Sequence, residues 1–130
     1  MLAKDITAEM KGHTFDLSNA SYSFVGEESF DSAGARVASA GDVDGDGFDD
    51  LIIGAPLNND GGADAGKTYL MLSSAITAQA EGHTFDLSSA SYSFVGQAAG
   101  DNSGHWVASA GDGDGDGEHD LLLGAPRWGA

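Results

Sequence analysis

Cysteine is absent from the 130-residue sequence, proline occurs twice, and only five residues are basic against 21 that are acidic. The lack of cysteine excludes disulfides, thiolate metal sites and a cysteine nucleophile, and it leaves the redox compartment undetermined. The formal net charge of −16 would repel phosphate backbones and anionic lipids, so we expect no binding to nucleic acid or to membrane surfaces. Such a charge favours the binding of cations instead.

The sequence also has no apolar run near the roughly 18 residues that a membrane span requires, so no membrane insertion is expected. Its first ten residues include Asp5 and Glu9 and have no apolar core, which excludes a secretory signal there. Glycine, in contrast, is abundant: 20 of 130 residues, about twice the roughly 7% usual in globular proteins. Together with the alternating apolar stretches, this composition predicts short strands joined by tight turns.

An internal repeat organises the chain. Gly12 to Pro56 aligns without a gap with Gly82 to Pro126, at an offset of 70 residues, and 31 of the 45 positions are identical. We therefore expect two copies of one unit. Residues 1–80 form the first repeat. Residues 81–130 form the second repeat, which is truncated before its third strand. That strand would be the counterpart of residues 66–72, if the strand at residues 107–110 is counted as the first.

Four strands are expected in each unit, from their alternating or continuous apolar patterns: residues 21–26, 37–40, 50–55 and 66–72. A short turn or helical segment is expected at residues 77–82. Four short strands with glycine at the corners are typical of a β-propeller blade. The predicted fold is all-β, with about two blades that either belong to a partial propeller or close into a ring by association of several chains.

Two acidic segments share the pattern D-x-D-x-D-G-x-x-D, at residues 42–50 and 112–120. The four carboxylates of the pattern would repel one another unless a cation lay among them. Glycine at position 6 permits a sharp turn, and position 7 can offer its backbone carbonyl. Such a cage of oxygen atoms suits Ca²⁺, whereas Mg²⁺ retains water and requires a stricter octahedron.

The segments thus predict two Ca²⁺ sites. The expected ligands are Asp42, Asp44, Asp46, the Phe48 carbonyl and Asp50 in the first, and Asp112, Asp114, Asp116, the Glu118 carbonyl and Asp120 in the second. An EF-hand is excluded because position 12 is Ile53 or Leu123, within an expected apolar strand.

No catalytic site is expected, and we predict that the chain is not an enzyme. The sequence contains no nucleophile elbow, P-loop or dinucleotide fingerprint. His13 and His83 recur at the repeat offset, which favours a structural role. His105 and His119 have no counterpart in the first copy, which argues against a shared catalytic role.

Other isolated residues are expected to be structural. Arg36 and Arg127 are cations in an acidic chain and should form ion pairs. Trp106 and Trp128 should pack at an edge or in a core, although stacking on a sugar or a partner remains open. Residues 27–36 and 97–106 differ most between the copies, so a recognition surface is expected there.

The blocks AGARVASAGDVDGDGFDDLIIGAP and SGHWVASAGDGDGDGEHDLLLGAP resemble the FG-GAP repeat of the integrin alpha-subunit β-propeller and of bacterial surface proteins. The resemblance implies that each repeat forms a propeller blade and that the acidic loop binds Ca²⁺ between its first two strands. It also implies a role in adhesion or protein interaction at the cell surface or outside the cell. Ala33-Gly34 and Ser103-Gly104 replace the Phe-Gly pair, and Phe24 and Phe94 are candidates to fill the missing aromatic volume.

Several alternatives stay open. The partner could be a protein or a carbohydrate, and the chain could be a repeat region of a larger secreted hydrolase or carbohydrate-binding protein. It could also associate with copies of itself to complete the propeller, or be part of a longer chain.

Overall fold

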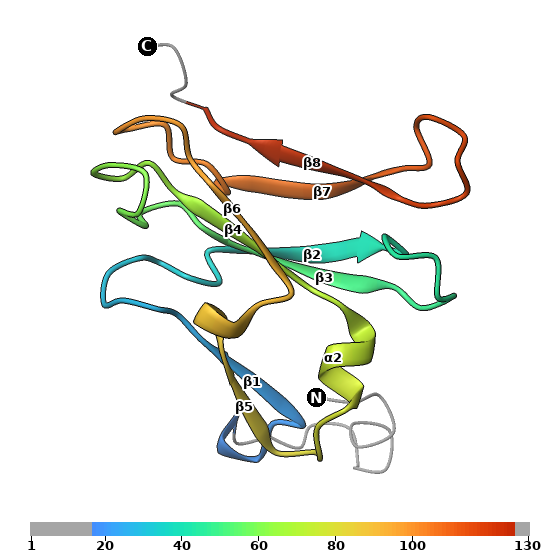
Figure 1. Ribbon diagram of the computed structural model, residues 1–130. Coiled ribbons are helices and arrows are strands. Elements are labelled where there is room, and N and C mark those ends of the chain that lie inside the picture. The colour runs from blue at the N-terminus through green and yellow to red at the C-terminus, as the bar shows by residue number, and fades with distance from the viewer. Residues whose placement is uncertain (1–16, 127–130) are drawn as a thin grey trace, which may run out of the picture.

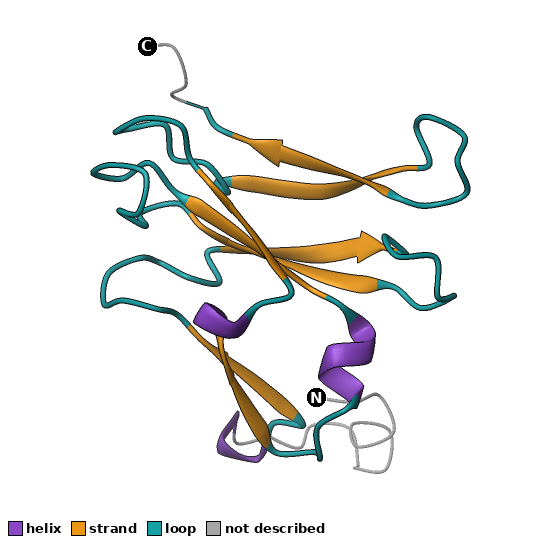
Figure 2. Cartoon of the chain, viewed as in Figure 1, coloured by secondary structure: helices purple, strands orange, loops and turns teal. Residues whose placement is uncertain are grey.

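The computed structural model describes residues 17–126 (Figures 1 and 2). Its strands are β1 (Tyr22–Val25), β2 (Arg36–Gly41), β3 (Asp50–Ala55), β4 (Lys67–Met71), β5 (His83–Asp86), β6 (Tyr92–Val95), β7 (Trp106–Gly111) and β8 (Asp120–Gly124). One short helix, α2 (Ser73–Thr77), and two single-turn 3₁₀ helices, η1 (Leu17–Asn19) and η2 (Leu87–Ser89), complete the described residues. None of these helices is long and apolar enough to cross a membrane. The expectation of an all-β fold is confirmed.

The centre of the molecule is a four-stranded antiparallel sheet with the order β2-β3-β4-β6. Its middle strands, β3 and β4, are apolar and almost entirely buried because both of their faces are covered. They pair in a register that sets Ile52 opposite Leu70 and Ile53 opposite Tyr69. A sheet of four short antiparallel strands is typical of a propeller blade.

The fourth strand of this blade comes from the second repeat. β1 and β6 have the same four residues, Tyr-Ser-Phe-Val, yet β6 pairs antiparallel with β4 whereas β1 pairs in parallel with β5. β5 occupies a segment for which no strand was expected. The short helix also lies earlier, at Ser73–Thr77, than the expected residues 77–82. The blade is therefore assembled across the boundary between the repeats.

Two apolar clusters hold the layers together. On one face of the sheet, Ile53, Tyr69 and Met71 pack with Phe85 and Leu87 from the β5 layer. On the other face, the cluster of Ala40, Ile52 and Leu70 packs against Val107 and Leu121 of the β7–β8 hairpin. Figure 1 shows the resulting three layers, with the sheet between the β1–β5 pair and the β7–β8 hairpin.

The aromatic volume missing at Ala33 is supplied in the first repeat by Phe24. The Phe24 ring stacks on Phe85 with a centroid distance of 5.2 Å, and both Phe24 and Ala33 contact the cluster around Ile53. Phe94 remains partly exposed, at 37%. The substitution of the Phe-Gly pair is thus compensated within the first repeat.

The loop before β2 carries two non-glycine residues with a left-handed φ, Phe30 and Ser32. Phe30 has φ +70° and its side chain is 91% exposed, while its counterpart in the second repeat is Gly100, with φ +82°. A left-handed conformation costs an L-residue about 1–2 kcal/mol. Phe30→Gly should therefore raise the free energy of unfolding by about 1 kcal/mol, measured by urea denaturation. A lowered unfolding midpoint would show instead that the Phe30 side chain makes stabilising contacts.

Candidate metal centre

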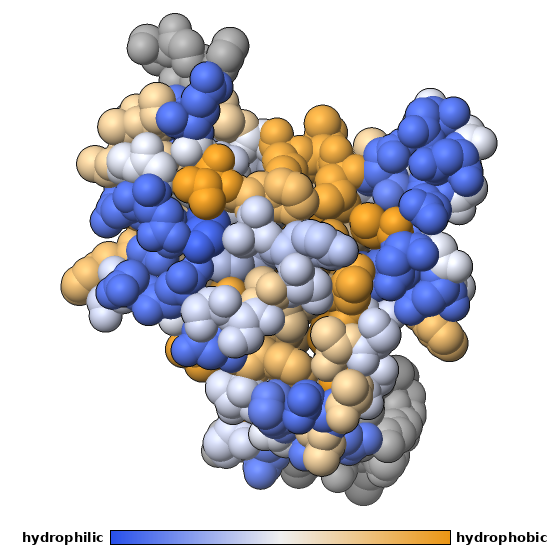
Figure 3. Space-filling view, in the orientation of Figure 1, coloured by the Kyte–Doolittle hydropathy of each residue, from blue (hydrophilic) through white to orange (hydrophobic). Residues whose placement is uncertain are grey.

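The two acidic loops occupy equivalent positions in neighbouring blades. Residues 42–49 connect β2 to β3, and residues 112–119 connect β7 to β8. Before each loop the strand pairing is shifted by a bulge, between Ser39 and Gly41 and between Ser109 and Gly111. Figures 1 and 3 show both loops projecting from the same side of the molecule as two hydrophilic lobes.

Three carboxylates meet in each loop. Asp42, Asp44 and Asp50 each present one oxygen such that the three lie within 4.8 Å of one another. The same holds for Asp112, Asp114 and Asp120. These are positions 1, 3 and 9 of the pattern. Asp46 and Asp116, at position 5, are not part of these groups, and the Asp46 Oδ2 atom instead accepts a hydrogen bond of 3.4 Å from the Ser73 hydroxyl.

Backbone amides hold the carboxylates of the first loop in place. The N–H of Gly47 donates to Asp42 Oδ2 at 2.8 Å, and that of Val43 to Asp50 Oδ2 at 2.9 Å. The N–H groups of Asp46 and Phe48 donate to Asp44 and Asp46, at 3.3 and 2.9 Å. These bonds fold the loop around the side chains, so its geometry is fixed by the positions of the aspartates.

The second loop repeats this network. Gly117 donates to Asp112 Oδ2 at 2.9 Å, and Gly113 to Asp120 Oδ2 at 2.8 Å. The glycine at position 6 has φ +90° in the first loop and +89° in the second, a conformation that favours glycine. The sharp turn expected at that position is therefore present in both copies.

The electrostatics of the loops reflect crowded negative charge. The pKa of Asp42 is lowered, chiefly by the hydrogen bond from the Gly47 N–H. The pKa of Asp44 is raised by partial desolvation, and the nearby charges of Asp46 and Asp50 add to this. At Asp114 the Asp116 N–H lowers the pKa, but desolvation and the charges of Asp116 and Asp120 outweigh it, so the pKa is raised. A cation between these carboxylates would relieve the repulsion.

The first loop is held more firmly than the second. The Asp50 residue is 4% exposed, and its second oxygen, Oδ1, accepts the Ser73 N–H at 2.8 Å, where α2 begins. Asp120 is only half-buried and, within residues 17–126, the one hydrogen bond given to its carboxylate is that from the Gly113 N–H. Asp50 thus joins the loop, β3 and the start of α2.

His119 connects the two loops directly. The Asp42 N–H donates to the His119 Nδ1 atom at 3.1 Å, and the His119 N–H donates to the Asp42 carbonyl oxygen at 2.9 Å. Sequence reasoning assigned His119 no role, because its counterpart in the first repeat is Asp49. Only the difference between the copies could have drawn attention to it.

The donor set fits a hard cation. Each loop brings three carboxylate oxygens together, and carboxylate oxygens are donors of the kind that Ca²⁺ prefers. No histidine or thiolate ligand belongs to either group. The residues therefore suit Ca²⁺ better than zinc or another transition metal.

The remaining singled-out residues have mixed outcomes. The His83 ring packs edge-on against Phe85, with a centroid distance of 4.6 Å, in keeping with the predicted structural role. Arg36 was predicted to form an ion pair; within residues 17–126 it pairs with no carboxylate and lies over the Trp106 ring. His13, Arg127 and Trp128 lie outside the described residues.

A blade with these neighbouring layers defines a β-propeller repeat protein. A family model of the FG-GAP repeat matches residues 33–71, a segment that covers β2, the first acidic loop, β3 and β4. Residues 33–71 therefore form an FG-GAP repeat, which belongs to a non-catalytic repeat family, and the resemblance seen in the sequence is confirmed. No curated protein matches the chain in a sequence comparison.

Proposed function

We propose that the chain is a calcium-binding, non-catalytic propeller module that serves adhesion or protein interaction at the cell surface or outside the cell. The observation that carries the proposal is the repetition of one carboxylate geometry in both loops, at positions 1, 3 and 9. The two sequences differ at positions 2, 7 and 8 of the loops, yet the aspartates at positions 1, 3, 5 and 9 recur and four backbone hydrogen bonds to them are common to both loops.

Bound Ca²⁺ would supply positive charge at the point where neighbouring strands enter and leave each loop. The carboxylates of Asp42, Asp44 and Asp50 would hold it in the first site, and those of Asp112, Asp114 and Asp120 in the second. Sites of this kind in extracellular modules have dissociation constants of about 10⁻⁴ to 10⁻³ M, so they are filled by extracellular calcium and largely empty in the cytosol. This range supports the proposed location.

Titration calorimetry of the chelator-treated chain tests the proposal. Two Ca²⁺ ions should bind to the wild type and one to each of Asp44→Asn and Asp114→Asn. At ten times the dissociation constant each ion should add about 1.4 kcal/mol to the free energy of unfolding, with a matching rise in the melting temperature. Asp49→Asn, a loop acid outside the ligand set, is the control and should still bind two. Absence of binding by folded wild-type protein would refute the proposal.

The two sites should differ in affinity. Because Asp50 is buried and held by both Val43 and Ser73, the first site is better organised than the second and loses less freedom on binding. We expect the first site to bind Ca²⁺ about tenfold more tightly, a difference of about 1.4 kcal/mol. Calorimetry on Asp114→Asn and Asp44→Asn isolates the first and second site respectively. Equal affinities, or a tighter second site, would contradict this ranking.

Association of copies is a related prediction. Among the described strands, β8 pairs only with β7, and Leu122 on β8 is 62% exposed. An open strand edge beside apolar surface invites pairing with another chain. Light scattering should give a mass above 13.2 kDa in calcium and a lower one in chelator. A monomer under both conditions would exclude ring closure by association.

A further inference from the structure

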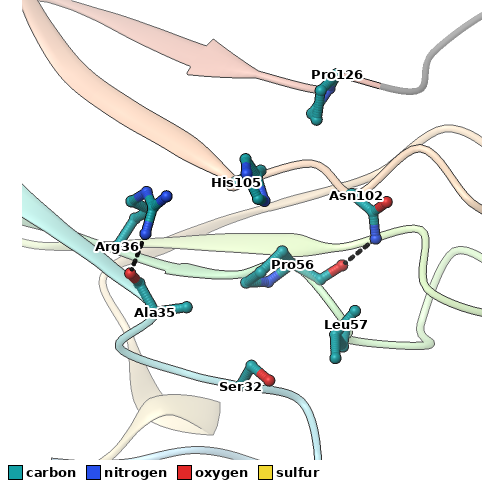
Figure 4. Close-up of a pocket in the computed structure, with 8 residues that line it drawn as sticks. All are labelled: Ser32, Ala35, Arg36, Pro56, Leu57, Asn102, His105 and Pro126. Carbon is teal, nitrogen blue, oxygen red and sulfur yellow. Dashed lines mark hydrogen bonds between the residues drawn. The ribbon is translucent and has the colours of Figure 1, made fainter.

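A cavity of about 620 Å³ lies at the opposite end of β2 from the first acidic loop. Figure 4 shows the residues around it, which come from the loop before β2 and its first residue, the segment after β3, the loop before β7 and the segment after β8: Ser32, Ala35, Arg36, Pro56, Leu57, Asn102, His105 and Pro126. Its size is in the range of about 300–1,000 Å³ typical of ligand sites. Segments 27–36 and 97–106, which differ most between the repeats, both contribute to it.

Arg36 lines this cavity and has no counter-ion in the part of the chain that the structure describes. No carboxylate of residues 17–126 forms an ion pair with it, although the chain is strongly acidic. Its guanidinium lies 4.4 Å from the centre of the Trp106 ring, and its Nη1 atom donates to the Ala35 carbonyl at 2.9 Å. Its Nε atom is buried and has no hydrogen-bond partner. Of the five N–H groups of a guanidinium, one is thus bonded to Ala35 and the buried Nε–H has no partner among residues 17–126.

The buried Nε–H of Arg36 is the unfavourable part of this arrangement, because it has lost hydration and donates to no acceptor among the described residues. An anion that reaches it from the cavity would supply the missing hydrogen bonds. The planar guanidinium, fixed on one face by Trp106, matches the two oxygens of a carboxylate.

The other lining residues define the rest of the ligand. The His105 ring packs edge-on against Trp106, and the Asn102 Nδ2 atom is engaged with the Pro56 and Asp64 carbonyls, which leaves its Oδ1 atom as an acceptor. The side chains of Pro56, Leu57 and Pro126 present apolar surface. A carboxylate with a neighbouring apolar group would match this lining, which suits a peptide better than a sugar.

We propose that the cavity binds an acidic peptide segment, with the carboxylate of an aspartate or glutamate on Arg36 and a neighbouring apolar side chain against Pro56 and Leu57. His105 and Ser32 contribute further polar contacts. The inference rests on the proposed interaction role and names the chemistry of the partner. It does not require the acidic loops to contact the ligand.

The test is a titration of the ¹⁵N-labelled full chain, saturated with Ca²⁺, with an acetylated and amidated Leu-Asp dipeptide. Its neutral counterpart, Leu-Asn, is the matched control. We expect the Nε–H signal of Arg36 and the indole signal of Trp106 to shift with Leu-Asp, and binding at least tenfold weaker for Leu-Asn. Equal binding of the two dipeptides, or no shift at Arg36, would overturn the assignment.

Two variants locate the site. Arg36→Gln should weaken binding of Leu-Asp at least tenfold, whereas Leu122→Ser, at an exposed position on β8 outside the cavity, should leave it unchanged.

Glucuronate serves as a second probe of the cavity. Tighter binding of glucuronate than of Leu-Asp would indicate an acidic sugar in place of a peptide and overturn the proposal. Calcium stoichiometry is measured in the same samples. Failure of dipeptide binding with two calcium ions bound would count against this inference alone, whereas failure of calcium binding would count against the proposed function.

Discussion

Replacing Lys67 with methionine should lower the free energy of unfolding by about 3 kcal/mol, the lower end of the range for breaking a buried ion pair. The Lys67 Nζ atom lies 2.6 Å from Glu27 Oε1 and 2.7 Å from Asp60 Oδ2, and its side chain is 10% exposed. The Tyr69 hydroxyl donates to the same Glu27 oxygen at 2.7 Å. Methionine keeps the length of the side chain but leaves two carboxylates without their cation.

Most of the lost stability should come from the Glu27 carboxylate, which is left without its cation. Its side chain is 21% exposed, whereas that of Asp60 is 48% exposed and remains hydrated. Burial together with the negative charge of Glu27 raises the pKa of Tyr69 well above its usual range, so the Tyr69 hydroxyl stays protonated as a donor. Without Lys67, that hydroxyl would be the remaining side-chain partner of the Glu27 carboxylate.

A neutral triple variant distinguishes lost charge balance from lost packing. Lys67→Met combined with Glu27→Gln and Asp60→Asn removes all three charges, and it should recover most of the stability lost in the single variant. Urea denaturation of the wild type and both variants gives the comparison. If the triple variant were as unstable as the single one, packing around the Lys67 stem would be the dominant contribution instead.

The same network has a defined pH dependence. Burial alone would lower the pKa of Lys67, but the hydrogen bonds that its ammonium donates to Asp60 and Glu27 outweigh it and raise the pKa above 10.5. A raised pKa for a lysine means that its stabilisation is complete below the unfolded value and is lost as the pH rises through the folded value. The stability difference between wild type and Lys67→Met should therefore be constant near neutral pH and shrink at strongly alkaline pH.

Pairing of the strands is where the sequence is least informative. The strands of the first blade and the acidic loops follow from local pattern, because burial on both faces dictates apolar runs and turns need glycine. The pairing partners of β1 and β6 do not follow from local pattern, because the two strands have identical residues and differ only in the strands beside them. β5 was missed because His83–Asp86 is short and has one buried residue, Phe85.

The candidate metal centre was predictable where it depends on local spacing and not where it depends on contacts between distant segments. Spacing places Asp42, Asp44 and Asp50 in one loop, and the structure brings their oxygens together. Asp46 was expected in the same cluster, but its outer oxygen faces Ser73, a residue 27 positions away along the chain. The contact of His119 with Asp42 and the stacking of Arg36 on Trp106 join different repeats, so neither could be inferred from the pattern of one repeat.

Replacing Gly54 with alanine should lower the free energy of unfolding by about 3 kcal/mol, at the upper end of the range for overpacking. Gly54, the glycine of the Gly-Ala-Pro block, lies near the end of β3, where the loop before β7 crosses it. A methyl group there would overlap the carbonyl oxygen of Gly104. Because the obstructing group is backbone rather than a flexible side chain, the two segments would have to move apart.

Gly104 has little freedom to retreat. It has φ +85°, its N–H donates to the Gly124 carbonyl at 3.0 Å, and a methyl group on it would approach the Lys67 carbonyl oxygen at 2.7 Å. The equivalent bond, from the Gly34 N–H to the Gly54 carbonyl, is present within the first repeat at 3.0 Å. Glycine at Gly54 therefore serves two contacts, one within its own blade and one with the next.

Gly124→Ala provides the matched control, since Gly124 occupies the same position of the same block in the second repeat. There a new methyl group would meet the Trp106 Cβ atom at 3.0 Å, a contact that a shift of a few tenths of an ångström relieves. We expect a loss of at most about 1 kcal/mol for Gly124→Ala. Urea denaturation followed by tryptophan fluorescence compares the two variants. Equal losses would show that the contact between β3 and the following blade is not what requires glycine at Gly54, and that the requirement lies in the blade itself.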